Sequence, residues 1–286
     1  MAAPEGLNTQ LGAPPAMPPV TAPKAPKPKQ KPKKRDGHYQ IHGTDGKQLK
    51  LQPSMESGGV PTPSPQYLAV SQGPVIRLEQ PQNLLLVIDL NGTLLFRPDK
   101  KKPKNFVARP NADLFLNYCL ETFSVLIWSS AKGENVTPMC DTLLTPEQRS
   151  KIIAVWGREK FKLSAGDYDK RVICFKRLTT VWSDSAIASS HPERAYGRIW
   201  DQSNTILIDD TAEKAKSEPH NILEVPEWSG DMTDNVLPVV HDYINNLSMH
   251  SNVSTVLRNN SFVEHLAQKQ HNPLQRLSET STVQGF

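Results

Sequence analysis

Residues 84–88 form an uninterrupted apolar run that ends at Asp89 and breaks at Asn91-Gly92. Five apolar residues without alternation indicate a strand covered on both faces, which is typical of parallel sheets in α/β proteins. Asp89 would then lie at the carboxyl end of that strand, where open α/β sheets bind ligands. Gly92 tolerates positive φ, so the next backbone N–H groups and the Thr93 hydroxyl can converge on an anion. The alternative is an ordinary Asn-Gly turn.

The distribution of prolines confines the folded core to one domain. Fourteen of the 25 prolines precede residue 80, and such runs favour extended polyproline conformations. We therefore predict a disordered Pro/Lys-rich arm over 1–79, a folded domain over 80–250 and a polar carboxyl-terminal tail over 251–286. Within the arm, residues 31–35 resemble a nuclear localisation signal, although a solvated basic linker explains them equally well.

The net charge of +4 comes from the arm. The stretch from Lys24 to Arg35 carries seven positive charges, and without it the chain has a net charge of −3. A mildly acidic folded part gives no reason to expect a nucleic-acid groove, so we expect no direct nucleic-acid partner. Its three cysteines are widely spaced and indicate neither a disulfide framework nor a zinc site.

Two targeting features, a membrane span and a transit peptide, bear on where the protein is found in the cell. No apolar run reaches eighteen residues, so we expect no membrane span. The first 34 residues contain no arginine and are interrupted by prolines, unlike a mitochondrial transit peptide. We expect a monomer in the nucleus or cytoplasm rather than the mitochondrion.

Further apolar runs alternate with helical patterns along the chain. Strands are predicted at 125–128, 205–208 and 221–225, and helices after Pro110 and over 136–144. This alternation favours a mostly parallel sheet with helices on both faces. Other expectations are short strands over 151–156 and 171–175, which would form a small β insertion around a polar turn at 164–167, a loop insertion over 183–204, and one amphipathic helix over 253–266.

Polar residues stand at or just after the carboxyl ends of these apolar runs. They are Asp89, Ser129, Lys176 and the pair Asp209-Asp210. In one parallel sheet they would converge on one edge, where carboxylates suit Mg²⁺ and a hydroxyl and an ammonium suit phosphoryl oxygens. Taken singly, each is better explained structurally, Ser129 as a helix cap, Lys176 as a solvated strand end, and the aspartate pair as a cap for a helix over 211–215. Taken together, their order and placement favour a site.

The chain resembles the haloacid-dehalogenase superfamily. Within it, the chain is similar to the phosphatases of the RNA polymerase II carboxyl-terminal tail and the related nuclear-LIM-interactor-interacting-factor-like proteins (the FCP1 homology family). The similarity runs from about Leu84 to about Leu247. The segments that carry it are Asp89-Leu90-Asn91-Gly92-Thr93-Leu94, Ala108-Arg109-Pro110 with Phe115-Leu116, Ile127-Trp128-Ser129-Ser130, Phe175-Lys176-Arg177-Leu178 and Leu207-Ile208-Asp209-Asp210-Thr211. The resemblance implies a Rossmann-like parallel sheet of haloacid-dehalogenase type with a small β insertion and a disordered amino-terminal arm.

The resemblance also implies a role for each site residue. Asp89 would be the nucleophile and a metal ligand, Asn91 would offer its backbone carbonyl to the metal, and Asp209 and Asp210 would complete the Mg²⁺ site. The phosphoryl group would be held by Lys176 and by four small residues of the two turns, namely Gly92, Thr93, Ser129 and Ser130.

Asn91 departs from the family signature, which has an aspartate two residues after the nucleophile. That aspartate protonates the leaving alkoxide and later takes a proton from the attacking water, and an amide can do neither. Loss of such acid–base help typically costs on the order of 10² to 10⁴ in rate.

The expected function is therefore a Mg²⁺-dependent phosphoserine/threonine protein phosphatase-like activity of reduced rate. It would act on a phosphorylated protein or peptide through an aspartyl phosphate on Asp89, with Asn91 and Lys176 as the other catalytic positions. Two alternatives stay open: a catalytically silent, phosphoprotein-binding pseudophosphatase, and a protein resembling the phosphatase-like subunit of the mitochondrial inner-membrane translocase, which binds preproteins.

Overall fold

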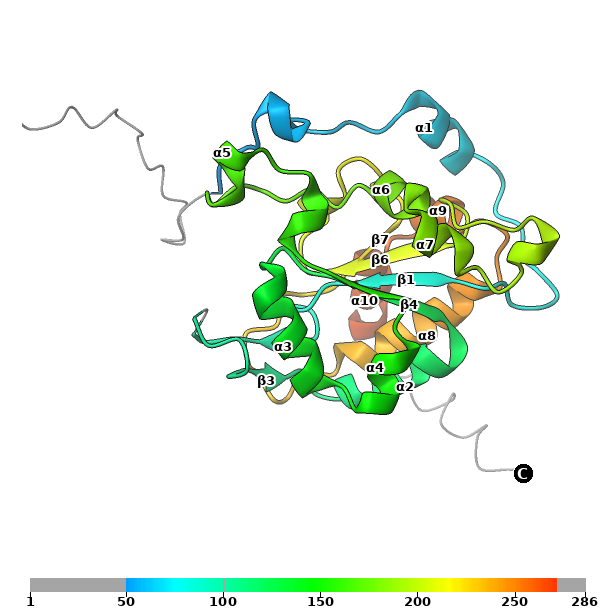
Figure 1. Cartoon of the computed structure of the whole chain (residues 1–286). Helices are drawn as coiled ribbons and strands as arrows, with labels where there is room; N and C mark the ends of the chain where they lie inside the picture. The colour runs from blue at the N-terminus through cyan, green and yellow to red at the C-terminus, as the bar shows by residue number, and fades with distance from the viewer. Residues whose placement is uncertain (1–49, 100, 272–286) are drawn as a thin grey trace, which may run out of the picture. The chain divides into compact units, whose positions relative to one another are not determined.

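Five parallel strands form the central sheet of the computed structural model, which describes residues 50–99 and 101–271 (Figure 1). In chain order they are β1 (Leu85–Ile88), β4 (Ser124–Trp128), β5 (Ala154–Trp156), β6 (Thr205–Asp209) and β7 (Ile222–Glu224). The spatial order β5-β4-β1-β6-β7 reverses direction at β1, as in doubly wound folds. The predicted parallel strands and the α/β fold class are therefore confirmed.

Helices cover both faces of this sheet, and in Figure 1 α2, α3 and α8 lie on the opposite face from α6 and α7. The α-helices are α1 (Pro65–Ser71), α2 (Ala112–Thr122), α3 (Gly133–Leu143), α4 (Pro146–Lys151), α5 (Ala165–Tyr168), α6 (Leu178–Ser183), α7 (Ser185–Ser189), α8 (Val236–Ser248), α9 (Val253–Asn259) and α10 (Phe262–His271). The 3₁₀ helices are η1 (Met55–Ser57), η2 (Arg158–Phe161), η3 (Arg194–Tyr196) and η4 (Ala212–Ala215).

Alternate residues of the central strands feed two separate hydrophobic cores. Leu86 and Ile88 of β1 point into a core shared with α2, α3 and α8, whereas Leu85 and Val87 point into one shared with α6 and α7. All four side chains are fully buried. An apolar run without alternation is therefore required at β1, because both faces of the strand are covered.

The small β element is present but lies elsewhere than predicted. It is a two-stranded antiparallel sheet of β2 (Leu95–Phe96) and β3 (Val107–Ala108), between β1 and α2. Of the segments predicted to form an insertion, β5 pairs with β4 as an edge strand of the main sheet. Residues 171–175 contribute one isolated bridge between Val172 and Leu51, and the turn between them contains α5.

Two other segments differ from the expectation. The predicted loop insertion at 183–204 contains α7, which begins because the Asp184 side chain accepts bonds from the backbone N–H groups of Ala186 and Ile187. The predicted helix at 253–266 is divided into α9 and α10. Ser261 and Glu264 form a reciprocal cap that starts α10.

The folded unit extends beyond the predicted 80–250 domain in both directions. Residues 50–79, placed in the disordered arm by the sequence, include η1 and α1, and Tyr67 of α1 is buried. At the other end, α9 and α10 bury Val253, Leu257 and Phe262 in the core shared with α8. The arm before residue 50, with its basic stretch, and the tail after 271 lie outside the described residues.

The structure also bears on the expectations for the cysteines and for a membrane span. The three cysteines are free and buried. Within residues 50–99 and 101–271, every helix is too short or too polar to traverse a lipid bilayer.

Candidate active site

The site begins at the carboxyl edge of the sheet, between β1 and β6. Ile88 aligns with Ile208 across this pair of strands, so Asp89 and Asp209 are neighbours at the same level. The Asp89 backbone N–H donates to the Ile208 carbonyl at 3.0 Å. This is the position where the strand order reverses and where ligands bind in open α/β sheets.

The turn after β1 brings backbone close to a carboxylate. Gly92 has φ +86°, and a Cβ at this position would lie 2.7 Å from Oδ2 of Asp210. The predicted use of Gly92 for positive φ is confirmed, and the close approach gives a second reason for glycine. Asn91, which precedes it, is half-buried. Thr93, which follows it, is fully buried, and its hydroxyl has no hydrogen-bond partner among the described residues.

Three carboxylates meet at this edge. Asp89 and Asp209 are buried and Asp210 is half-buried, and one ligand atom from each lies within 4.8 Å of the others. A cluster of this kind is costly unless cations neutralise it.

Lys176 is the first of two lysines that neutralise the cluster. Its side chain is fully buried, and Nζ lies 2.7 Å from Oδ2 of Asp209 and 3.1 Å from Oδ1 of Asp89. The backbone N–H of Lys176 donates to the Lys214 carbonyl at 2.7 Å, which ties its segment to η4. An ammonium has three N–H donors and only one of those of Lys176 is hydrogen-bonded among the described residues, to Asp209, so donors are left for a phosphoryl oxygen.

Lys214 is the second cation, and the sequence reasoning missed it. Its Nζ lies 2.9 Å from Oδ2 of Asp89, 2.7 Å from Oδ1 of Asp209 and 3.1 Å from Oδ1 of Asp210. Burial favours the neutral amine, but the three carboxylates outweigh this effect and raise the pKa of Lys214 well above its ordinary value. The signal available in the sequence was the four-residue spacing from Asp210, which places a lysine one turn after the acidic pair.

Ser129 and Ser130 follow the neighbouring strand, β4. Ser129 is buried, its N–H donates to the Trp156 carbonyl at 2.9 Å, and its hydroxyl accepts a 3.3 Å bond from the Ala131 N–H. Ser130 is half-buried. The structure therefore places both serines at the carboxyl edge of the sheet, in a turn adjoining the strand that leads to Asp89.

Arg109 was part of a recognised motif but had no assigned role. Its buried guanidinium makes two 2.8 Å bonds with the carboxylate of Asp234 and donates at 3.1 Å to the Thr93 carbonyl. The paired bonds fix the orientation of the guanidinium. Arg109 thereby links Asp234 to the Thr93 carbonyl and so stabilises the turn that follows Asp89.

The residues present fit a divalent cation. Three carboxylates supply the hard oxygen ligands that Mg²⁺ prefers. Oδ1 of Asp89 lies 3.1 Å from Nζ of Lys176 but accepts no hydrogen bond within the described part of the chain. Two ammonium groups leave one of the three carboxylate charges uncompensated. Asp89, Asp209 and Asp210 could therefore hold Mg²⁺, provided that Lys214 gives up part of its contact with the same oxygens.

Comparison with known proteins identifies what this arrangement resembles. Residues 84–254 match the model of the NLI interacting factor-like phosphatase family. An uncharacterized FCP1 homology domain-containing protein of Schizosaccharomyces pombe is 32% identical over 205 residues, covering 67% of this chain and 82% of that relative. Subunit TIM50 of the mitochondrial import inner membrane translocase of Caenorhabditis briggsae is 28% identical over 155 residues, covering 53% of this chain but only 28% of that relative.

Among solved structures, the chain is similar to Fcp1, an essential RNA polymerase II CTD phosphatase. The sequence identity is 13% and the TM-score is 0.32, with coverage of 67% of this chain and 54% of that chain.

Proposed function

The chain belongs to the NLI interacting factor-like phosphatase family, and from this premise we propose that it is a Mg²⁺-dependent phosphoserine/threonine phosphatase-like protein of reduced turnover. Its substrate would be a phosphorylated protein or peptide, and Asp89 would carry the phosphoryl group. The observation that supports this most is the buried contact of Asp89 with Lys176 and Lys214, within a three-carboxylate cluster at the reversal of strand order.

The chemistry follows from the groups that surround Asp89. An oxygen of Asp89 attacks phosphorus, the new bond forms an aspartyl phosphate, and the bond to the serine or threonine oxygen breaks. Lys176 holds a phosphoryl oxygen and offsets the negative charge that gathers there. Bound Mg²⁺ would supply further charge neutralisation at the phosphoryl oxygens. Water then attacks the aspartyl phosphate, which releases phosphate and restores the Asp89 carboxylate.

The two proton transfers of this reaction have no general acid or base at position 91. The departing alkoxide must take up a proton and the attacking water must lose one, and the amide of Asn91 can do neither. Proton transfer would then depend on solvent water. We expect turnover on the order of 10² to 10⁴ below that of a site with aspartate at this position.

A second candidate is a phosphoprotein-binding pseudophosphatase. It is favoured by the same residue, because Asn91 removes proton transfer while Lys176 and the carboxylates are kept. A third candidate, preprotein binding, is favoured by the similarity to the translocase subunit. The two binding functions differ in their ligand, a phosphopeptide in one case and an unphosphorylated presequence peptide in the other.

The first test compares wild type with Asp89→Asn and Asn91→Asp. Phosphate release from p-nitrophenyl phosphate and from a phosphoserine peptide is measured with and without Mg²⁺. If wild type exceeds Asp89→Asn, the protein is an enzyme; if only Asn91→Asp turns over, the site is intact but natively silent, and the next question is what it binds. If none of the three is active and only a presequence peptide binds, the phosphatase proposal is wrong.

One chemical control accompanies this test. Asn-Gly sequences deamidate readily, which would convert Asn91 to aspartate in some molecules. Mass spectrometry of the peptide across Asn91 detects that conversion, and activity with a uniform asparagine mass belongs to the native residue.

A further inference from the structure

Lys176 lies on a segment that the central sheet does not hold. Residues 172–176 are all buried, yet none of them belongs to a strand of that sheet. On one side the segment is tied to η4 by the bond between the Lys176 N–H and the Lys214 carbonyl. Its other side needs a different support.

That support comes from residues 50–73, which we call the strap. The strap precedes the family-matched region at 84–254. The Leu51 N–H donates to the Arg171 carbonyl and the Ile173 N–H donates to the Leu51 carbonyl, both at 2.9 Å, so the strap pairs with the lysine segment as a strand would.

A second contact lies directly beside the lysine. Nη2 of Arg177 donates to the carbonyls of Gly58 and Gly59, both at 2.9 Å. These carbonyls face the guanidinium because both glycines have left-handed backbones, with φ of +80° and +52°. Bonds from a charged donor are among the stronger hydrogen bonds in proteins.

The strap is fixed at two further places. Near its start, Asp167 accepts bonds from the Ser54 N–H and the Ser57 hydroxyl, both at 2.7 Å. Near its end, the buried Tyr67 hydroxyl donates to Asn221 at 2.9 Å and accepts a 2.8 Å bond from the His220 N–H.

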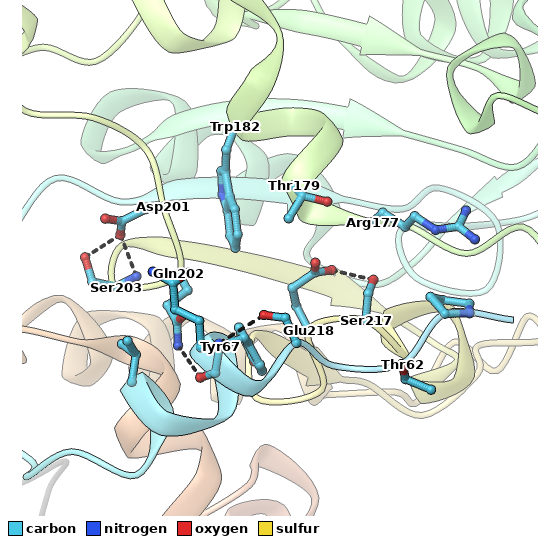
Figure 2. Close-up of a pocket in the computed structure, with 14 residues that line it drawn as sticks. Thr62, Tyr67, Arg177, Thr179, Trp182, Asp201, Gln202, Ser203, Ser217 and Glu218 are labelled. Atoms are coloured by element: carbon cyan, nitrogen blue, oxygen red, sulfur yellow. Dashed lines mark hydrogen bonds between the residues drawn. The ribbon is translucent and has the colours of Figure 1, made fainter. Parts of the chain in front are cut away.

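Between these points the strap crosses a cleft of about 540 Å³ (Figure 2). Figure 2 shows Tyr67 and Thr62 of the strap on one side of the cleft and Trp182 and Thr179 of α6 on the other, with Arg177 at one end. The strap thus does not pack continuously on the domain here. Its link to the lysine segment is concentrated in the contacts of Leu51, Gly58 and Gly59.

We propose that the strap is a positioning element for Lys176, acting through the juxtaposition of Gly58 and Gly59 with Arg177 and of Leu51 with Ile173. The phosphoryl site of this chain would then depend on residues outside the family-matched region. The link to phosphate binding rests on the proposed function, whereas the link to the order of the lysine segment does not.

Two glycines provide a matched test. A Cβ at Gly58 would lie 3.2 Å from Nη2 of Arg177, whereas a Cβ at Gly197, with nearly the same φ of +79°, would meet nothing within 4 Å. Gly58→Ala and Gly197→Ala therefore impose a similar backbone strain, but only the first disturbs Arg177. Arg177→Met removes the same contact from the other side, and Arg194→Met, at an exposed arginine of η3, is its control.

Two measurements are made on the full chain. The first is amide hydrogen exchange of the peptide that contains Ile173 and Lys176, and the second is binding of inorganic phosphate. We expect Gly58→Ala and Arg177→Met to speed exchange about tenfold or more and to weaken phosphate binding, with both control variants like wild type.

The outcomes separate the two proposals. If exchange in Gly58→Ala and Arg177→Met equals that of the controls, the strap does not position Lys176 and the inference is wrong. If exchange rises and phosphate binding is unchanged, the strap orders the segment without serving the phosphoryl site, which also overturns it. A wild type that binds no phosphate contradicts the proposed function, while the exchange result still decides whether the strap orders the segment.

Discussion

At the scale of single residues, Gly92 is subject to two constraints that together require glycine at this position. Its φ of +86° costs an L-residue about 1–2 kcal/mol. In addition, a Cβ would approach Oδ2 of Asp210 to 2.7 Å, so the carboxylate must move. We expect Gly92→Ala to weaken Mg²⁺ binding about tenfold or more, measured by titration calorimetry, because one of three ligands is displaced. Gly197→Ala carries comparable strain without a neighbour, and an equal loss in that variant would assign the effect to stability alone.

Lys214 contacts the same three carboxylates that could hold a metal ion. Its Nζ lies within 3.1 Å of an oxygen of Asp89, Asp209 and Asp210, so a divalent cation and the ammonium compete for these oxygens. We expect Lys214→Met to bind Mg²⁺ roughly tenfold more tightly, because a nearby positive charge is removed.

Calorimetric titration with Mg²⁺ measures this change. Lys132→Met is the control, because Lys132 pairs with Asp169 at a solvent-exposed position. Weaker Mg²⁺ binding by Lys214→Met would instead mean that Lys214 orients the carboxylates for the metal.

At the scale of elements, long apolar runs were predictable as strands, but the segment with which residues 171–175 pair was not. β1, β4, β6 and β7 are apolar runs bounded by polar residues, which is why the sequence identified them and the acids at the ends of β1 and β6. Residues 171–175 have the same character, but their β-bridge is to Leu51, about 120 residues earlier, and sequence periodicity does not record such pairing.

The helices show the same division. A cap was available in the sequence to divide α9 from α10, since Ser261-Phe262-Val263-Glu264 has the spacing of a capping box, and the amphipathic pattern across it concealed the break. The site residue Lys214 was missed for a related reason. In the sequence, residues 211–215 entered only as a helix that the aspartate pair would cap, whereas η4 directs Lys214 into the carboxylates.

The attachment of the strap to α5 gives a prediction for pH. The Ser54 N–H, followed by the Ser57 hydroxyl, lowers the pKa of Asp167 to about 2 from its ordinary 3.8. The folded state thus favours the charged carboxylate, and this stabilisation is complete above about pH 4 and is lost as the pH falls toward 2.

We expect exchange at the Ser54 amide, which bonds Asp167, to accelerate over that interval. Hydrogen exchange measured between pH 5 and 2, corrected for the intrinsic rate, tests this. Asp167→Asn keeps a hydrogen-bond acceptor without a titrating charge, so its corrected exchange should be independent of pH. The same acid-dependent loss in Asp167→Asn would assign the effect to another group.

At the scale of the whole molecule, the family-matched region and the folded unit have different limits. Residues 84–254 contain the sheet and the carboxylate cluster. They exclude the strap, which buries Tyr67 and pairs with the lysine segment, and most of α9 and α10, which bury Leu257 and Phe262. The carboxylate cluster therefore lies within the family-matched region, whereas some of the contacts that position Lys176 come from the strap, outside that region.

This difference predicts how shortened chains unfold. A chain of residues 50–271 retains every described contact of this unit and should unfold at the same temperature as the full chain. A chain of residues 84–254 loses three large buried side chains, each contributing about 1.5–3 kcal/mol. We expect its unfolding midpoint to fall by roughly 10 °C or more, measured by calorimetry. Equal midpoints for all three chains would show that the flanks lie on the domain without stabilising it. A loss confined to 84–254 would place the strap and the last two helices within the cooperative unit that holds Asp89 and Lys176 together.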